Sequence, residues 1–245
     1  MFDSRILQQI TVNTHSSVRI GGEKVIYVDP LNIEDEPHDA DLILVTHPHF
    51  DHLSAKDIKK LMKDDTVIAA PRSIAKIVKL RTGREPSAVL PAQSLTLCGI
   101  PVETVAAYNR MKPAHLRGMG WVGYVLTLGE TRIYITGDTD VTPETQAVKC
   151  DILMLPVSGG MYTMTAKQAA DLTNQIRPHT VIPIHYGALL GGKDAPEIFR
   201  QGVAAGIETD IRDTVYNHLM VRQYLRIIPI VLGCGIIGYF IGQML

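Results

Sequence analysis

Three histidines and one aspartate lie within six positions of one another in residues 46–52, directly after the apolar run 42–45. They are His47, His49, Asp51 and His52. Neutral imidazole and carboxylate are ligands for zinc, manganese or iron, and a turn that leaves a strand can direct alternate side chains to two ions. This spacing predicts a metal site at the end of a strand, with a solvated histidine-rich loop as the alternative.

The pattern His-x-His-x-Asp-His resembles the signature of the metallo-β-lactamase superfamily. The resemblance implies an α/β fold of the αββα sandwich type and a dinuclear centre. In that superfamily the first two histidines bind one metal ion, and the aspartate and the next histidine bind the other. It also implies that Asp51, besides binding the second metal, accepts the proton of the attacking water. We expect two divalent ions, zinc before manganese.

The resemblance requires a third histidine for the first ion, a bridging carboxylate and a third ligand for the second ion. His115 is the only histidine between the first motif and Asp138. Asp138 follows the alternating run 131–135, so its carboxylate sits where a strand ends. His185 likewise ends the apolar run 181–182. The predicted metal ligands are therefore His47, His49, Asp51, His52, His115, Asp138 and His185.

Other residues have weaker predicted roles. His15 lies in a turn between two expected strands, where a part supporting the metal ligands and an ordinary backbone-bonded turn histidine are equally good interpretations. Lys112, Tyr162 and Tyr186, with Arg117, are candidates for contacts with phosphate or oxyanion groups of a substrate, although solvated Lys and Arg side chains are the commoner case.

Four further segments narrow the resemblance. Residues 107–112, 118–124, 137–140 and 156–164 look like a branch of small, single-domain metal-dependent hydrolases. That branch includes L-ascorbate-6-phosphate lactonase and, more distantly, enzymes of the N-acyl phosphatidylethanolamine phospholipase D type. Residues 158–161 depart from the branch's Gly-Gly-Thr, which bears on the substrate pocket.

Composition fits one large α/β domain with an appendage. The chain has 245 residues, 46% of them hydrophobic, and a net charge of −1, so it offers no basic surface for nucleic acid. Short strands are expected in the first third of the chain, then at 67–70, 94–97, 121–128, 133–136 and 152–154. Helices are expected after Ser54, at 74–78, at 165–176 and at 195–204. This mixture predicts two stacked sheets with helices outside.

The last nineteen residues, 227–245, carry no charge and are long enough to span a bilayer. We divide the chain into a hydrolase domain, 1–217, and a linker with a C-terminal membrane anchor, 218–245. Arg222 and Arg226 precede the apolar run and would keep the catalytic domain in the cytoplasm. A buried helix in a soluble cytoplasmic protein is the alternative. Gly238 and Gly242 would let two such helices approach, so a homo-oligomer is compatible with the sequence.

These features together predict a dinuclear hydrolase that activates a bridging water to cleave an ester, lactone or phosphodiester bond. The substrate is expected to be a small or lipid-like molecule. An inactive membrane scaffold of the same fold is disfavoured because every ligand position is filled. An RNA-processing nuclease is disfavoured because the charge balance provides no basic exosite.

Overall fold

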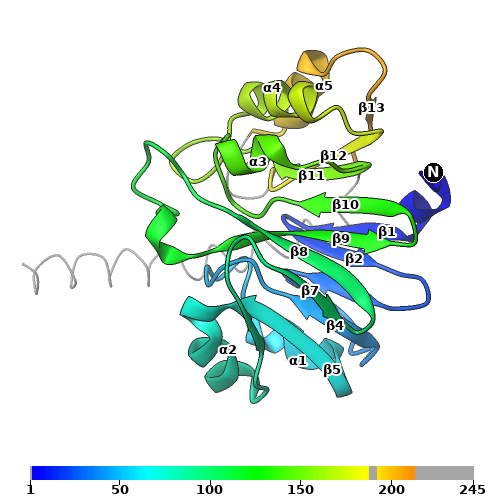
Figure 1. Ribbon diagram of the computed structural model, residues 1–245, viewed down its shortest axis with the longest axis vertical. Helices are drawn as coiled ribbons and strands as arrows, with labels where there is room; N and C mark the ends of the chain where they lie inside the picture. Colours follow the sequence, from blue (N-terminus) through cyan, green and yellow to red (C-terminus); the bar gives the residue numbers. More distant parts are fainter. Residues whose placement is uncertain (1, 188–191, 213–245) are drawn as a thin grey trace, which may run out of the picture.

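The computed structural model describes residues 2–187 and 192–212. Two mixed β-sheets dominate it (Figure 1). The first runs in the order β1 (Ile10–Thr14), β2 (Ser17–Ile20), β3 (Ile26–Val28), β4 (Ala40–Leu44), β5 (Met62–Pro71) and β6 (Ser87–Val89). The second runs in the order β13 (Glu208–Thr209), β12 (Thr180–Ile184), β11 (Ile152–Pro156), β10 (Thr131–Ile135), β9 (Val122–Leu128), β8 (Ile100–Ala106) and β7 (Ser94–Leu97).

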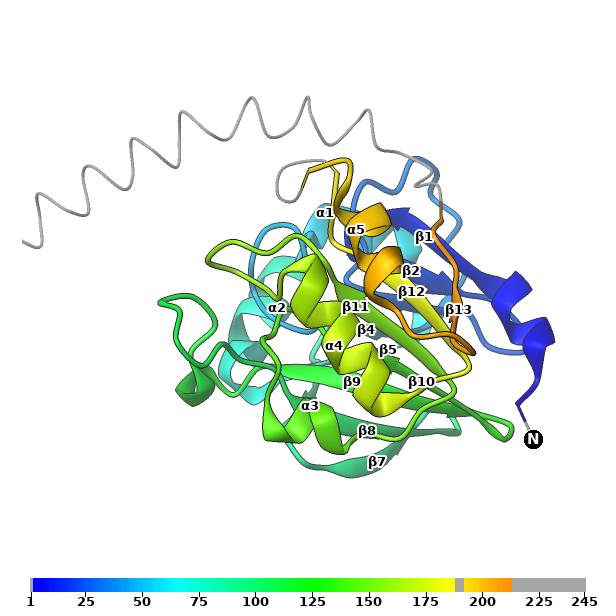
Figure 2. The same cartoon turned by 90° about the horizontal axis from the view of Figure 1, so that it is seen from above.

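Helices cover the outer face of each sheet. In Figure 1, α1 (Ala55–Leu61) and α2 (Ala75–Thr82) lie beside the first sheet. Figure 2 shows α3 (Pro143–Ala147), α4 (Ala166–Ile176) and α5 (Ala195–Gly202) over the second sheet. Three short 3-10 helices complete the fold: η1 (Ser4–Gln9), η2 (Arg72–Ile74) and η3 (Arg117–Met119). The predicted α/β sandwich of two sheets is confirmed.

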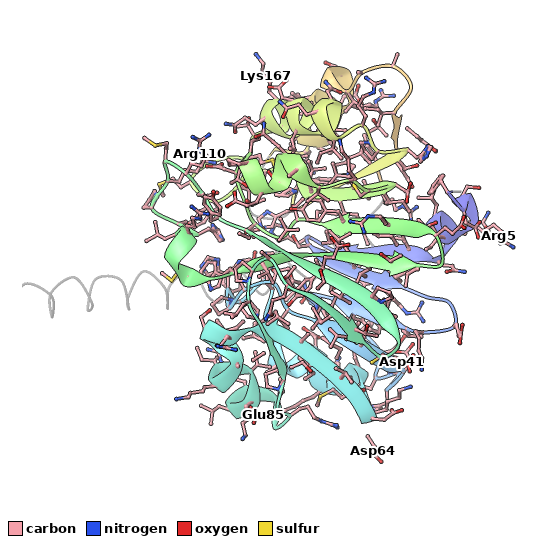
Figure 3. The ribbon with its side chains drawn as sticks, viewed as in Figure 1. Arg5, Asp41, Asp64, Glu85, Arg110 and Lys167 are labelled. Atoms are coloured by element: carbon pink, nitrogen blue, oxygen red, sulfur yellow. The ribbon has the colours of Figure 1, made fainter. Side chains whose placement is uncertain are left out.

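Three apolar clusters hold these layers together. The central cluster joins inward-facing residues of both sheets, such as Val18, Leu42 and Ile135. A second cluster packs β10, β11 and β12 against α4 and α5, and a third packs β4 and β5 against α1 and α2. Side chains fill the space between the sheets, whereas exposed charged side chains such as Arg5, Glu85 and Lys167, labelled in Figure 3, point outward. Burial on both faces explains why strands 42–45 and 152–155 read as continuous apolar runs.

Parallel pairing brings several strand ends to one edge of the sandwich. Strands β3 and β4 are parallel in the first sheet, and β10, β11 and β12 are parallel in the second. The carboxyl ends of neighbouring parallel strands meet at the same edge of a sheet. The loops that leave these five strands therefore gather together, and they carry most of the predicted site residues.

The helix caps follow the sequence signals. Ser54 caps α1 by accepting from the backbone N–H of Asp57, as predicted. Thr165 and Gln168 form a reciprocal capping box at α4. The short helix α3 was not predicted; its signals are Thr142 as N-cap and Pro143 in the first turn.

The predicted C-terminal apolar helix and the boundary at residue 217 lie outside the described residues. Among the described helices, none is both long and apolar enough to cross a bilayer.

Candidate metal centre

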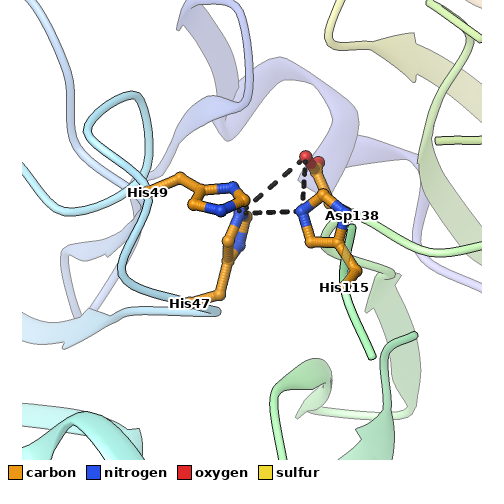
Figure 4. A group of neighbouring side chains, drawn as sticks. All are labelled: His47, His49, His115 and Asp138. Atoms are coloured by element: carbon orange, nitrogen blue, oxygen red, sulfur yellow. Dashed lines mark hydrogen bonds and ion pairs between the residues drawn. The ribbon is translucent and has the colours of Figure 1, made fainter. Parts of the chain in front are cut away.

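Four predicted ligands, His47, His49, His115 and Asp138, come from three loops and form the first half of a buried cluster (Figure 4). His47 Nε2 lies 3.0 Å from His49 Nδ1 and 3.3 Å from His115 Nε2. Asp138 Oδ2 lies 3.4 Å from His115 Nε2 and 3.8 Å from His47 Nε2. Ligand atoms about 2.0–2.1 Å from one tetrahedral ion are about 3.3 Å apart. The observed separations therefore match the spacing that a zinc-sized ion requires.

The second half of the cluster shares Asp138 with the first. His52 Nε2 lies 3.4 Å from Asp51 Oδ2 and 3.5 Å from Asp138 Oδ1. His185 Nε2 lies 3.5 Å from Asp51 Oδ2 and 3.2 Å from Asp138 Oδ2. Both oxygens of Asp138 thus face imidazole nitrogens, in the position of a carboxylate shared by two cations.

Buried polar atoms without partners show that the cluster suits cations. Among the described residues, His52 Nε2, His185 Nε2 and Asp138 Oδ1 are buried and have no hydrogen-bond partner. Such atoms carry a free-energy cost unless something satisfies them. Lone pairs of nitrogen and oxygen that point at a common centre are satisfied by a divalent cation. The donor set therefore fits divalent metal ions.

Electrostatics lead to the same conclusion. Burial alone favours a neutral carboxyl at Asp138, but His185 and His52 hold its pKa well below its usual range. Burial likewise opposes charge on His185, yet Asp138 and Asp51 raise its pKa to about 9. The two carboxylates thus draw positive charge into the cluster, as protons when no metal is bound and as metal ions when they are available.

Asp29 and Thr46, which were not among the predicted site residues, fix two of the histidine rings through a chain of hydrogen bonds. Asp29, at the end of β3, accepts from the Thr46 backbone N–H (2.8 Å) and the Thr46 hydroxyl (2.6 Å). Its Oδ2 also lies 2.6 Å from His52 Nδ1, which therefore carries the proton. Because the Thr46 hydroxyl donates to Asp29, it accepts from His47 Nδ1 at 2.9 Å. Both rings therefore keep a proton on Nδ1, which leaves Nε2 as the nitrogen that can bind a metal.

Other supporting contacts come from the second sheet. Ser158, after β11, lies 2.9 Å from His185 Nδ1 and orients that ring. The side-chain amide of Asn109 donates to Ala114 O and Tyr162 O, which ties the loop of His115 to the loop after β11. Trp121 packs its ring 5.0 Å from His47, 5.2 Å from His49 and 5.4 Å from His115, measured between ring centroids. Single polar residues in loops show no periodicity, so only their position at strand ends could have indicated them.

His15 lies inside the cluster. Its Nε2 is 3.3 Å from Asp51 Oδ2, its ring centroid is 3.6 Å from that of His185, and its carbonyl accepts from the His185 backbone N–H at 2.9 Å. Burial and the neighbouring His185 lower the pKa of His15 to about 4, so the ring is neutral. The contact from His15 to His185 joins the first sheet to the second at the site.

Backbone geometry at the site is unusual. His15, Asp29, His115 and His185 all have positive φ, between 45° and 57°. Non-glycine residues rarely adopt this conformation, and it concentrates at functional sites. Gly137, with φ of +62°, precedes Asp138, and a side chain there would be strained by this φ and crowded by Thr46, whose Cβ would lie 3.1 Å from an added Cβ.

The three predicted substrate-contact residues, Lys112, Tyr162 and Tyr186, have different surroundings. Lys112 Nζ lies 2.5 Å from both Asp140 Oδ1 and Thr163 O, so its ammonium is engaged within the protein. The Tyr186 hydroxyl donates to Arg212 O at 3.1 Å. The Tyr162 ring lies 6.3 Å from that of His115 and is partly exposed, so this side chain lies beside a clustered histidine.

Comparisons with known proteins agree with this geometry. Residues 9–185 match the Beta-lactamase superfamily domain. A UPF0173 metal-dependent hydrolase from Thermoplasma acidophilum is 30% identical and covers 76% of this chain and 86% of its own. A UPF0173 metal-dependent hydrolase from Aeropyrum pernix is 31% identical, and the match covers 80% of this chain and 90% of that protein.

A solved structure from Parabacteroides distasonis, assigned as a metal-dependent hydrolase, is 31% identical. It covers 84% of this chain and 92% of its own, with a TM-score of 0.68. This chain therefore belongs to the UPF0173 family of metal-dependent hydrolases, within the metallo-β-lactamase superfamily.

Proposed function

We propose that the chain is a dinuclear hydrolase in which Asp138 is shared between two metal ions. His47, His49 and His115 complete the shell of the first ion, and Asp51, His52 and His185 complete that of the second. The observation that supports this most is the arrangement of imidazole nitrogens at ligand spacing on both sides of one carboxylate. Zinc suits this mixture of imidazole and carboxylate best.

Two divalent cations bound there would supply an activated water and polarise the bond under attack. The chain's own residues prepare that step. Asp29 and Thr46 keep the protons of His52 and His47 on Nδ1, away from the metals. Asp51 is ionised, because the neighbouring histidines outweigh burial and hold its pKa well below the usual range. In the proposed reaction this carboxylate would accept a proton from the water. An ester, lactone or phosphodiester would be cleaved.

Metal analysis of purified variants tests this proposal. The wild-type chain should hold two zinc or manganese ions, and His115→Ala should lose metal and hydrolysis together. Asp138→Asn should bind at most one ion tightly, because a neutral bridge no longer offsets the repulsion between two cations. His179→Ala is the control, since that exposed imidazole lies 3.9 Å from Asp151, outside the cluster. Two tightly bound ions in Asp138→Asn would contradict the bridging role.

A membrane location remains part of the proposal. It rests on the uncharged run 227–245 and the arginines before it. Fractionation of the full chain tests it: the protein should require detergent for extraction, and recovery in the soluble fraction would refute the anchor.

A further inference from the structure

Exposed apolar side chains are frequent in the loops that carry or contact the clustered histidines. Six of them form what we name the apolar rim: Phe50, Met111, Leu116, Met119, Met161 and Tyr162. Phe50 lies between the clustered residues His49 and Asp51, and Leu116 follows His115. Scattered surface hydrophobics are ordinary, but a group confined to the loops of one site indicates a binding surface.

Contacts between the loops show that the rim is continuous with the site. The His49 and His115 rings lie 4.8 Å apart and bring the loop after β4 against the loop between β8 and β9. Asn109 donates to the carbonyls of both Met161 and Tyr162, so the loop after β11 packs against the same segment. The three loops that carry the rim therefore meet at the clustered histidines.

Cations near the rim are largely neutralised within the protein. Lys112 is held by Asp140, and Arg117 pairs with Glu144 at 2.8 Å. Arg110, labelled in Figure 3, lines a cleft of about 450 Å³ with Asp171 and with the rim residue Met111, and none of the clustered histidines lines that cleft. The rim thus presents apolar surface beside the metals where a phosphate-binding enzyme would present free positive charge.

We propose that the apolar rim binds an aliphatic chain attached to the scissile group, so that the preferred substrates are acyl esters or alkyl-substituted lactones. This inference rests on the proposed function, because it takes the clustered histidines as the reacting end. The aliphatic chain of the substrate would lie across these exposed side chains, so its methylenes are partly removed from water. The affinity should therefore increase with the length of the aliphatic chain.

The protein carries its own probe for this binding. Trp121 is the single tryptophan of the chain and packs against three clustered histidines. Titrating the metal-loaded full chain with acetate and with decanoate, below the micelle concentration, compares ligands with one head group and two chain lengths. Trp121 fluorescence reports binding without any turnover. Decanoate should bind at least about tenfold more tightly than acetate.

Two triple variants locate the effect. The rim variant carries Met111→Ser, Met119→Ser and Met161→Ser, at side chains 93%, 44% and 57% exposed. The control variant carries Leu80→Ser, Ile77→Ser and Ile198→Ser on α2 and α5, at 86%, 40% and 49%. The rim variant should keep its metal and its affinity for acetate but lose the preference for decanoate, and the control should keep it. Equal binding of both ligands to the wild-type chain, or equal loss in both variants, would overturn the proposal.

The wild-type chain and the two variants also distinguish two sources of the aliphatic chain, namely bilayer lipids and monomeric esters. Vesicles of phosphatidylcholine should compete with decanoate in a rim-dependent way if bilayer lipids are the substrates, and should not compete if monomeric esters are. Failure of the proposed function has a separate signature, namely no metal-dependent hydrolysis of acetyl or decanoyl esters. The fluorescence titration does not depend on that outcome.

Discussion

Asp29 is the buried carboxylate on which the geometry of both halves of the cluster depends. It is 1% exposed and accepts three hydrogen bonds, from His52 Nδ1 and from the backbone and hydroxyl of Thr46. Asp29→Asn keeps the size and tolerates the φ of 45° at this position. Its amide oxygen can keep either the bond from the Thr46 backbone at Oδ1 or the two bonds from the Thr46 hydroxyl and His52 at Oδ2, and an NH₂ group then faces the remaining donors.

The cost can be estimated from those contacts. A hydrogen bond to a charged group contributes about 1.5–3 kcal/mol, so losing one or two should lower the free energy of unfolding by about 1.5–6 kcal/mol. Removing the carboxylate that orients His52 should lower the affinity for the proposed second metal ion by about 10- to 100-fold. Isothermal titration with zinc measures the affinity, and urea unfolding of the metal-free chain measures the stability.

Asp57→Asn is the matched control. Asp57 is also buried and accepts three hydrogen bonds, from the Asn32 and Ile33 backbones and the Ser54 hydroxyl, but it touches no clustered histidine. It should lose comparable stability and keep its metal affinity. Wild-type affinity for both ions in Asp29→Asn would refute the argument that this carboxylate fixes the His52 ring.

Further predictions concern packing, protons and the C-terminus. Gly123→Ala should destabilise the fold by about 3 kcal/mol or more in urea unfolding, because a Cβ there would lie 2.4 Å from Thr136 O; an unchanged midpoint would contradict this close approach. Metal binding at pH 7 should release protons, since the pKa of His185 is raised to about 9 and that of His52 well above its usual value. The apparent affinity for metal ions should therefore fall as the pH is lowered. Calorimetry in buffers of different ionisation enthalpy measures the number of protons released on metal binding, and a value of zero would contradict this prediction. Truncation after Asn217 should yield a protein that stays in solution without detergent and still binds two metals. A truncated chain that cannot fold would show that residues 218–245 belong to the core.

The sequence carried most of the information about the clustered residues because their chemistry and their position at strand ends coincide. His47, Asp138 and His185 each follow an apolar run, and the structure brings all three together. Strand β8 was not predicted because Pro101 interrupts its alternating pattern. Strand β5 begins earlier than expected, because the charged residues 63–65 give no strand signal. They lie in a register shift between Met62, which pairs with Ala40 of β4, and Val67, which pairs with Leu42.

The supporting residues show where single-sequence reasoning ends. Asp29 follows the strand run 26–28, the same position that identified Asp138, but no neighbouring histidine singled it out. Ser158 and Asn109 become significant only through partners 27 and 6 positions away, His185 and His115. Such relations depend on tertiary contacts, which no local pattern records.

The contact between His15 and His185 has a kinetic consequence. It joins residues 170 positions apart and belongs to both sheets, so the cluster cannot assemble until the two halves of the sandwich have docked. Interactions that form after the transition state slow unfolding and leave the folding rate nearly unchanged. Bound metal should therefore lower the unfolding rate strongly and leave the folding rate nearly unchanged. Chelation would then shorten the lifetime of the folded chain while the refolding rate stayed the same.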